Sequence, residues 1–471
     1  MNSTKSEATY TEEGQALAYS NITCQQLIEL FSTCFGPNGS YKALVTNELE
    51  LTRNGHMLCK GIKFSHPTSI IITRAGRAIY ERVGDGVKTF ILLTSFIFTE
   101  AFEQYMDGSK IPHIVKDLND CVEAINVYLK NNLLPLDDAN LQLLINSQVN
   151  NINITEIIMK VIKHTNDLSL VEIMRIETDE NKFIPGLVLD HGIRHSLMPS
   201  LVENCAILVT NMSLEYEQPE VNAEFVYSSI EKRENFARVE KATIEEKALK
   251  FVELAKSLGD KKLVIFNEKG IDLTALEILA KKGILALRRC KRRNLERLVN
   301  MCGGKIITQQ EQINKDNLGF CKQVKVKKIA DEQFTFVEGV PLKGACTILI
   351  KDNIEFDRTR ETFKGALRAV MLAIKERCCI RGGKHLFVEL HKYFKSQNKN
   401  TGQLVMTKAF EKICKILIKN EGKPAHEEFV KITNEGSDMV IDNVSVLGNV
   451  LTNGIFTAVS ILLCDEIITN K

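Results

Sequence analysis

Apolar residues recur at the three-to-four-residue spacing of helices toward both ends of the chain. The pattern predicts long helices over residues 13–35, 68–82 and 88–106, and again after residue 360. The first of these must end at Gly36-Pro37, because proline cannot continue the hydrogen-bond ladder and glycine favours a turn. The chain is therefore predicted to be helix-rich at its two ends.

A shorter segment between the first two helices has the pattern of paired strands. In residues 42–59, KALVTNELELTRNGHMLC, two extended stretches flank Asn54-Gly55, a dipeptide typical of tight hairpin turns. We therefore expect a β-hairpin here, with its turn at Asn54-Gly55.

The middle of the chain alternates short apolar stretches with helical ones. The stretches CAILVTNMSL, KLVIFNE, GILALRR and KIITQQ are typical of strands, and LTALEILAKK and NLERLVNMCG between them have helical spacing. This alternation predicts a βαβαβ unit near residues 200–335. A charged stretch at 230–257 is expected to be helical. The predicted fold class is α+β with several domains, one of which is α/β.

Composition and charge are those of an ordinary globular protein. The chain has 471 residues, and its 61 Lys and Arg nearly balance 59 Asp and Glu, so a nucleic acid or membrane partner would need a local basic patch. No CxxC pair occurs among the thirteen cysteines, which favours reduced thiols in the cytoplasm. The apolar run FILLTSFIF at 90–98 is far shorter than the ~20 residues of a membrane span. We expect a soluble, cytoplasmic protein.

Two glycine-containing loops are candidates for binding a phosphate. In Gly84-Asp85-Gly86 the acidic residue stands just before a predicted helix, where free N–H groups favour an anion and the carboxylate could hold a magnesium ion. A second loop, FGPNGS at 35–40, could supply further backbone donors. Each loop is also common as a simple turn. No GxxxxGK[ST] motif occurs, so a Walker-type site is not supported.

The order and spacing of longer motifs add a resemblance to a known family. CFGPNGSYKALV, LTRNGHMLC, HPTSIIITRA and GDG follow one another as they do in group II chaperonins. GLVLDHGIRH, LEYEQPEVN, KGIDLTALEILAKKGILALRRCKRRNLERL, GALRAVMLAI and TAVSILLCDEI are similar to the zeta-type subunits of the eukaryotic cytosolic chaperonin. The resemblance extends over nearly the whole chain.

The resemblance implies three domains and a place in a larger assembly. It implies a helical equatorial domain over 1–137 and 379–471, a small intermediate domain over 138–199 and 339–378, and an α/β apical domain over 200–338. Such a subunit would join other chaperonin subunits in a double ring, bind unfolded cytosolic polypeptides and take part in a cycle that uses ATP and Mg²⁺. No membrane partner is implied, and a nucleic-acid partner is not favoured.

The same resemblance identifies residues that would contact the nucleotide. They are Gly36, Pro37, Asn38, Gly39, Asp85, Gly86, Val87, Lys88, Thr89, Gly382 and Asp442, with Asp85 as the metal ligand. Val87 and Lys88 replace two hydroxyl residues of the family pattern. Lys88 could therefore replace a phosphate contact with charge, or lie in a salt bridge on a helix surface. Both alternatives stay open at this point.

The residues that the family uses for hydrolysis are missing. Asn54 stands where the family has an Asp, and it cannot carry a negative charge. Gly365 stands where the family has the Asp that polarises the attacking water, with Glu361 one helical turn earlier as a weak substitute. No catalytic residue is therefore intact. The resemblance predicts a subunit that binds nucleotide weakly or hydrolyses it poorly, with a nucleotide-free structural subunit as the alternative.

Other parts of the family pattern have also changed. The glycine-rich turn appears as Gly382-Gly383-Lys384-His385-Leu386-Phe387 and keeps the first glycine but not the third or the Glu. The chain is about twenty residues shorter than the family before DMVIDN, in a segment near the nucleotide base. The intermediate-domain Thr-Ser pair corresponds to Val149-Asn150 in the alignment that we prefer.

Two further motifs have functional and structural interpretations. In DHGIRH, the i,i+4 pair His191 and His195 could bind a metal on a helix, but Gly192 between them favours a bend and a hinge role. RRCKRRNLER at 288–297 could be a polypeptide-binding face, a solvated face or an RNA-binding patch. The first is preferred, with the client-binding residues Arg289, Arg292, Arg293 and Arg297.

Overall fold

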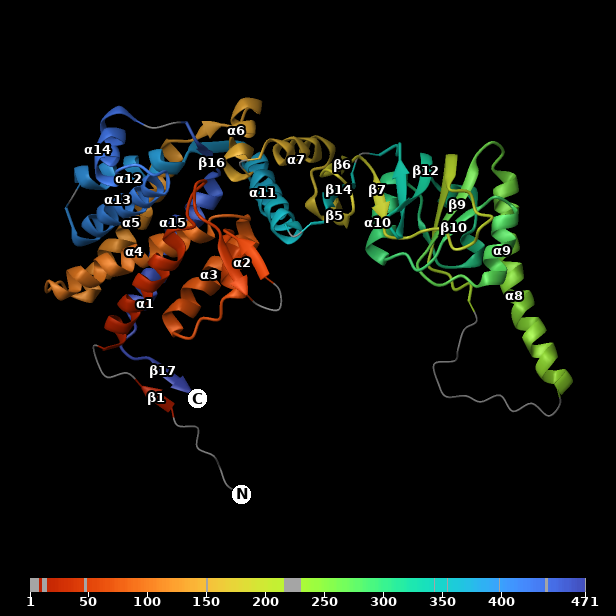
Figure 1. Cartoon of the computed structure of the whole chain (residues 1–471), viewed down its shortest axis with the longest axis horizontal. Coiled ribbons are helices and arrows are strands. Elements are labelled where there is room, and N and C mark those ends of the chain that lie inside the picture. The colour runs from red at the N-terminus through yellow and green to blue at the C-terminus, as the bar shows by residue number, and fades with distance from the viewer. Residues whose placement is uncertain are drawn as a thin grey trace, which may run out of the picture. The chain divides into compact units, whose positions relative to one another are not determined.

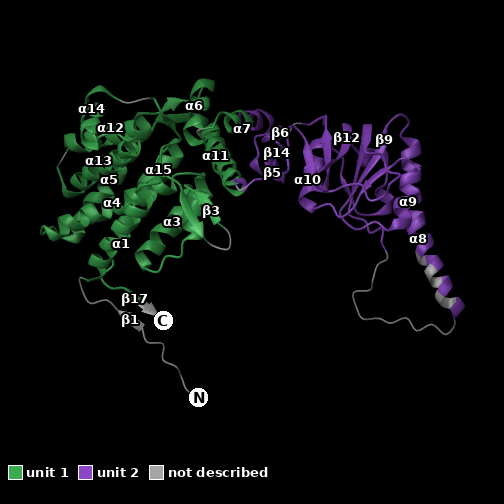
Figure 2. Cartoon of the chain, in the orientation of Figure 1, with its two compact units in different colours: residues 1–158, 357–471 green, residues 159–356 purple. Residues whose placement is uncertain are grey.

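The computed structural model describes residues 8–10, 15–45, 49–149, 151–215, 230–342, 344–353, 355–397, 399–436 and 439–470. These residues form two compact units (Figure 2): unit 1 over 1–158 and 357–471, and unit 2 over 159–356. The predicted equatorial segments fall in unit 1 and the predicted apical segment in unit 2. The predicted intermediate segments are divided between them, so the three-domain division stays a prediction.

Unit 1 is mainly helical, as the two ends of the sequence predict. Its helices are α1 Gln15–Ser32, α2 Gly55–Gly61, α3 Pro67–Val83, α4 Val87–Met106, α5 Ile111–Asn131, α6 Asp138–Val149, α12 Gly383–Gln397, α13 Thr401–Asn420, α14 Ala425–Glu435 and α15 Val444–Leu462. Helices α7 Ile152–His164 and α11 Phe356–Glu376 cross the two boundaries between the units. The helices predicted over 13–35, 68–82, 88–106 and after 360 are confirmed.

The core of unit 1 is built around α4. Its residues Phe90, Ile91 and Phe98 have no solvent-exposed surface, because α1, α5, α13 and α15 pack around this helix (Figure 1). Helix α15 is long and apolar enough to cross a membrane by length and composition, but half of its most apolar window is buried in the same core. We therefore interpret α15 as a core helix.

Unit 1 also contains short strands. These are β1 Ala8–Tyr10 paired with β17 Ile468–Asn470, β2 Lys42–Val45 paired with β3 Leu49–Thr52, and a three-stranded sheet of β16 Ile441–Asp442, β15 Cys378–Arg381 and β4 Leu134–Pro135. The hairpin predicted for 42–59 is present as β2 and β3, but its predicted turn is wrong. Asn54 and Gly55 follow the second strand, where Asn54 caps α2. Asn before Gly is compatible with both a turn and a helix start.

Unit 2 has the α/β organisation predicted for the middle of the chain. Its strands are β5 Val171–Ile176, β6 Lys182–Ile184, β7 Leu187–Leu189, β8 Leu201–Thr210, β9 Lys262–Asn267, β10 Leu285–Leu287, β11 Ile306–Ile307, β12 Gly319–Ile329, β13 Glu332–Glu338 and β14 Cys346–Lys351. Its helices are α8 Ile230–Ser257, α9 Leu273–Lys281 and α10 Arg292–Cys302, with 3₁₀ turns at Leu168–Leu170, Gln310–Gln312 and Lys315–Asn317.

A seven-stranded mixed sheet organises unit 2. Its order is β10-β9-β8-β12-β13-β7, with β11 also paired to β8. Strands β8, β9, β10 and β11 are parallel, which confirms the predicted βαβαβ unit, and β12, β13 and β7 extend the sheet antiparallel. A second sheet of β5, β14 and β6 lies in the same unit. The charged stretch 230–257 forms α8 as expected.

A buried charge links two core helices of unit 1. Glu100 of α4 is only 1% exposed, and its carboxylate forms ion pairs with Lys408 and Lys412 of α13, the first at 3.2 Å. Among the described residues, neither carboxylate oxygen accepts a well-aligned hydrogen bond, so the lysines act on Glu100 mainly through their charge. A buried carboxylate that loses its partners is strongly destabilising.

We predict that the double substitution Lys408→Ala, Lys412→Ala lowers the free energy of unfolding by about 3 kcal/mol, because it leaves Glu100 charged and unpaired. Urea denaturation of the full chain measures this change. Adding Glu100→Gln to the double variant should recover at least half of the loss. Lys392→Ala is the control, since it removes a more exposed i,i+3 pair with Glu389 and should cost about 0.5 kcal/mol. Equal losses in the double variant and the control would contradict this assignment.

Candidate functional site

The loop Gly84-Asp85-Gly86 joins α3 to α4 through two left-handed glycines. Gly84 ends α3 with φ 87°, and Gly86 precedes α4 with φ 88° and offers no side-chain cap to its N–H groups. A Cβ at Gly86 would lie 2.5 Å from Val450 of α15, and one at Gly84 would lie 2.5 Å from the carbonyl oxygen of Gly365 in α11. Only glycine fits at either position. The contacts with α11 and α15 therefore hold Asp85 just before α4.

The second predicted loop, residues 36–39, lies beside the first. Gly36 has φ 81°, and a Cβ at Gly39 would lie 2.4 Å from the backbone carbon of Cys34. Arg53 donates to the carbonyl oxygen of Pro37 at 2.7 Å. Lys88, from the first turn of α4, donates to the carbonyl oxygen of Cys34 at 2.8 Å. The two predicted loops are therefore brought together, with Lys88 as the link.

The side chain of Lys88 makes a contact that neither open alternative named, and its phosphate role stays a prediction. The ammonium group is half-buried and bonded to a backbone carbonyl, and no carboxylate lies within 4 Å of it among the described residues. Burial lowers the pKa of Lys88, while the nearby charge of Asp85 acts to raise it. The side chain crosses Gly55, where a Cβ would lie 2.7 Å from the Lys88 Cγ atom. Lys88 is therefore an internal cation of the loop region.

Asp442 comes to the same place from the other end of the chain. Strand β16 pairs with β15, and the Asp442 Oδ2 atom accepts the N–H of Gly383 at 2.9 Å. A Cβ at Gly382 would lie 1.8 Å from the same Oδ2 atom, so this glycine is required. Desolvation raises the pKa of Asp442 to about 6, and the charge of Asp85 adds to this rise, whereas the Gly383 N–H opposes it.

Asp85 and Asp442 are near enough for the charge of Asp85 to raise the pKa of Asp442. Although solvent reaches Asp85, desolvation by the surrounding protein raises its pKa, while the Gly86 N–H and Lys88 lower it. The two carboxyl groups offer acceptors for hydroxyl groups, and the backbone N–H groups of the glycine loops offer donors for a phosphate. One carboxylate beside an ammonium is a poor magnesium site, since Mg²⁺ prefers several oxygen ligands.

Val87 and Thr89 lie in the first turn of α4, and only Thr89 has a hydroxyl group. Val87 is 4% exposed and belongs to the core of unit 1, and it packs near Gly55 and Gly76. Thr89 is half-buried. The side chain of Val87, the first in the predicted phosphate-binding turn, therefore packs in the core.

At Asn54 and Gly365, where the family has acidic residues, the residue present has a structural role in this fold. The Oδ1 atom of Asn54 accepts the N–H of His56 at 2.9 Å and that of Met57 at 3.4 Å, so its oxygen is used to cap α2. At Gly365, a Cβ would lie 2.7 Å from the carbonyl oxygen of Gly84. Helix α11 therefore packs directly on the loop, and an aspartate at 365 would force the backbone apart.

Glu361 is not free to replace the missing carboxylate. Its Oε2 atom accepts the hydroxyl of Tyr80 at 3.3 Å, and its Oε1 atom pairs with Lys364 at 3.1 Å. Burial, with the Glu361 carboxylate as a smaller effect, raises the pKa of Tyr80 well above its usual range. The pair Val149-Asn150 cannot be assessed as a pair, because Asn150 lies outside the described residues.

In unit 2, the sequence predicts a basic polypeptide-binding face at Arg289, Arg292, Arg293 and Arg297. The placement of Arg297 on this face is wrong, because its side chain is 2% exposed. Its guanidinium donates to Glu172 at 2.6 Å and to the carbonyl oxygen of Leu170 at 2.8 Å. Arg297 therefore anchors α10 to the start of β5. Its partner is far away in the sequence, so helical periodicity could not reveal it.

The other three arginines are exposed but have acidic neighbours. Arg289 precedes α10 and has φ 57°. Carboxylates lie within 4 Å of each guanidinium, namely Glu215 near Arg289, Glu268 and Glu296 near Arg292, and Glu172 near Arg293. Much of the positive charge on this face is thus already balanced.

The DHG segment forms a polar clasp and no metal site. Among the described residues, no group of three or more His, Cys, Asp or Glu side chains could hold a metal ion. His191 lies 3.1 Å from Asp190 and 2.8 Å from the carbonyl oxygen of Arg289. The Asp190 carboxylate beside the ring raises the pKa of His191, burial opposes this, and the Arg289 carbonyl adds to the rise. The clasp thus holds Arg289 in its left-handed conformation.

Comparison with known proteins explains why these loops occur together. The model of the TCP-1/cpn60 chaperonin family matches residues 27–471. The chain belongs to this family. It is 29% identical to the human (Homo sapiens) T-complex protein 1 subunit zeta-2, over 99% of this chain and 98% of the human protein. It is also 29% identical to the mouse (Mus musculus) T-complex protein 1 subunit zeta-2, over 98% of this chain and 96% of the mouse protein.

These findings confirm the predicted zeta-like chaperonin subunit and its α+β fold. The chain is a chaperonin subunit that assists protein folding and assembles with other subunits of its family. The family is ATP-dependent, which supports nucleotide use, and the role of the two glycine loops and Asp442 in it stays a prediction.

We predict that the clasp stabilises unit 2 more at low pH than at high pH. A raised pKa in the folded state means that the protonated ring contributes stability below its unfolded pKa of about 6.5, and that this contribution is lost as pH rises through the folded value. Substituting His191→Gln should therefore lower the urea midpoint more at about pH 6 than at about pH 8.5. In an Asp190→Asn background, the same substitution should lose this pH dependence. An equal effect at both pH values would refute the charged clasp.

Proposed function

We propose that this chain is a ring subunit of a cytoplasmic chaperonin that binds nucleotide weakly and does not hydrolyse it at a useful rate. The observation that carries the proposal is the Lys88 ammonium, which bonds to the Cys34 carbonyl between the two glycine loops. Its charge also acts on Asp85. A fixed cation in this place reduces the attraction of Asp85 for a magnesium ion.

A nucleotide fits the remaining residues better than a metal does. The backbone N–H groups of Gly36 and Asn38 and those at the start of α4 can bind phosphate oxygens, and Asp442 can accept a ribose hydroxyl. If a metal accompanied the nucleotide, Asp85 would be its protein ligand. A bound metal would neutralise phosphate charge. The ammonium group of Lys88 would provide part of this neutralisation without a metal.

Hydrolysis requires a group that activates water, and its loss commonly costs ~10²–10⁴-fold in rate. The three candidates for that group are Asn54, Gly365 and Glu361. The first caps α2, the second has no side chain, and the third is paired with Tyr80 and Lys364. These engagements support binding without turnover. Folding work in the ring would then be driven by neighbouring subunits.

Client binding by Arg289, Arg292 and Arg293 remains part of the proposal. Their exposure supports contact with polypeptide, but their acidic neighbours weaken the case for a strongly acidic client at this face. A nucleic-acid role has less support, because those same carboxylates would repel phosphate.

Purified rings that carry Asp85→Ala in this subunit should keep nearly all of their ATP hydrolysis. We expect a change smaller than the share of one active subunit, since no water-activating group is available here. Steady-state phosphate release from assembled rings measures it. The matched control is the same Asp substitution in a neighbouring subunit that has all of the family's acidic residues, and it should lower the rate. A full single-subunit loss with Asp85→Ala would make this chain an active ATPase.

Nucleotide binding to the full chain tests the role of Lys88 directly. Without Mg²⁺, Lys88→Met should weaken the binding of ADP about tenfold, because one charge-assisted interaction is lost. Adding Mg²⁺ should restore much of the affinity, since Asp85 is then free of the internal cation. Lys364→Met, which removes a lysine that pairs with Glu361, is the control and should bind as the original chain does. Equal affinity of both variants without Mg²⁺ would exclude a contribution of Lys88 to nucleotide binding.

The terminal strands provide a separate test of ring assembly. β1 and β17 form a two-stranded antiparallel sheet in which Ala8 pairs with Asn470 and Tyr10 with Ile468. An isolated sheet of two strands is only marginally stable, so these strands gain from further pairing within an assembly. Deleting 465–471 should therefore keep the chain out of rings while leaving it soluble. Co-purification with the other subunits measures this, and normal rings containing the truncated chain would overturn it.

A further inference from the structure

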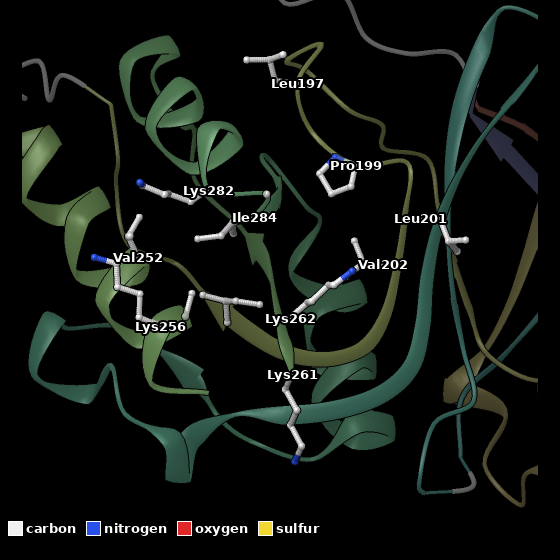
Figure 3. Close-up of a pocket in the computed structure, with 13 residues that line it drawn as sticks. Leu197, Pro199, Leu201, Val202, Val252, Lys256, Lys261, Lys262, Lys282 and Ile284 are labelled. Carbon is white, nitrogen blue, oxygen red and sulfur yellow. The ribbon is translucent and has the colours of Figure 1, made fainter. Parts of the chain in front are cut away.

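A pocket in unit 2 lies at the amino ends of the parallel strands β8, β9 and β10 (Figure 3). Its volume is about 460 Å³. The segment before β8, the last turns of α8 and the turn between α9 and β10 complete its walls. It is separate from α10, none of whose residues lines it. The volume lies within the range of pockets that hold small ligands or a few residues of a peptide.

The floor of this pocket is apolar. Val202, Val252 and Ile284 are buried there, and Figure 3 shows their side chains between the surrounding ribbons. At the mouth, Leu197 is 61% exposed and Leu201 is 45% exposed. Exposed leucines continuous with a buried apolar floor favour a ligand that has its own apolar group.

Lysines surround this apolar floor. Lys256, Lys261, Lys262 and Lys282 line the pocket, and no Asp or Glu does. The Lys261 ammonium lies 3.7 Å from the centre of the Phe320 ring and is engaged there. The other three lysines are exposed, and none has a carboxylate within 4 Å in the part of the chain that the structure describes.

The lack of ion pairs sets these three lysines apart from several lysines on α8 and α9. On α8, Lys241 pairs with Glu245 and Lys250 with Glu246, and on α9, Lys281 pairs with Glu277. The exposed arginines around α10 also have acidic neighbours. The pocket therefore concentrates unbalanced positive charge around an apolar floor, whereas the predicted basic face does not.

We propose that this pocket binds an acidic polypeptide segment that inserts one or two apolar side chains. Carboxylates flanking a leucine or phenylalanine would meet the three lysines while the apolar group entered the floor. A nucleic acid is a poorer occupant, because no aromatic or arginine side chain lines the pocket to stack on a base. The inference rests on the chain's role as a polypeptide-binding chaperonin subunit and names the chemistry of the polypeptide.

The test uses the full chain without nucleotide, so its result does not depend on the nucleotide proposal. The probe is a short fluorescein-labelled peptide of Asp, Glu and Leu, and binding is followed by fluorescence anisotropy. The triple variant Lys256→Glu, Lys262→Glu, Lys282→Glu should weaken binding about tenfold or more at low salt. The matched control is Lys269→Glu, Lys305→Glu, Lys315→Glu, which makes the same charge change at exposed lysines outside the pocket.

The apolar half of the proposal needs its own variants. Leu197→Ser with Leu201→Ser should weaken binding about threefold to tenfold, because both side chains are exposed at the mouth and contribute contact area with the ligand. Replacing the leucines of the probe with serine should have a similar effect. The control triple variant should bind the leucine probe as the original chain does.

Three results would overturn the proposal. The first is equal weakening by the pocket variant and the control variant, which would show attraction by net charge alone. The second is equal binding of the leucine and serine probes, which would show that the apolar floor is not used. The third is tighter binding of a single-stranded RNA of the same charge, lost in the pocket variant, which would identify a nucleic-acid site.

Discussion

The close approach of two glycines, Gly84 and Gly365, is the constraint on which the nucleotide region of unit 1 depends. The carbonyl oxygen of each glycine lies where a Cβ on the other would have to be, at 2.5 Å and 2.7 Å. Helix α11 can therefore rest directly on the loop that joins α3 to α4. The same contact fixes Asp85 at the start of α4 and leaves no room for a carboxylate on α11.

Under the proposed function, this packing explains how a site keeps its architecture without the residues for hydrolysis. A loop of left-handed glycines needs partners that fit closely around it, and α11 and α15 provide them. Close packing favours a small residue at 365, whereas hydrolysis would need an acidic one. Lys88 and Val87 fit the same trend, since one satisfies a loop carbonyl and the other fills the core. At each of these positions the residue present stabilises the fold, whereas the family pattern has a residue suited to the reaction.

Much of the fold could be predicted from local periodicity. The apolar spacing of 68–82 and 88–106 gives α3 and α4, and the alternation around 200–335 gives the parallel strands of unit 2. The prediction failed where one pattern allows two structures. Asn54-Gly55 suits a hairpin turn, but the oxygen of Asn54 instead accepts backbone N–H groups at the start of α2. The local sequence around Asn54-Gly55 could not distinguish these outcomes, because they depend on where β2 and β3 pair.

The candidate sites show the same limit over longer distances. The glycine loops and Asp442 were predictable because a family resemblance joins them, whereas the bond from Lys88 to Cys34 depends on the fold. Periodicity also placed Arg297 on an exposed face, although Glu172 draws it into the interior. A count of basic residues therefore does not locate a binding surface; what matters is whether nearby carboxylates balance them. By that measure, Arg297 belongs to the internal structure of unit 2, and the exposed arginines around α10 have much of their charge balanced. The lysines at the amino edge of its sheet keep their charge available for a partner.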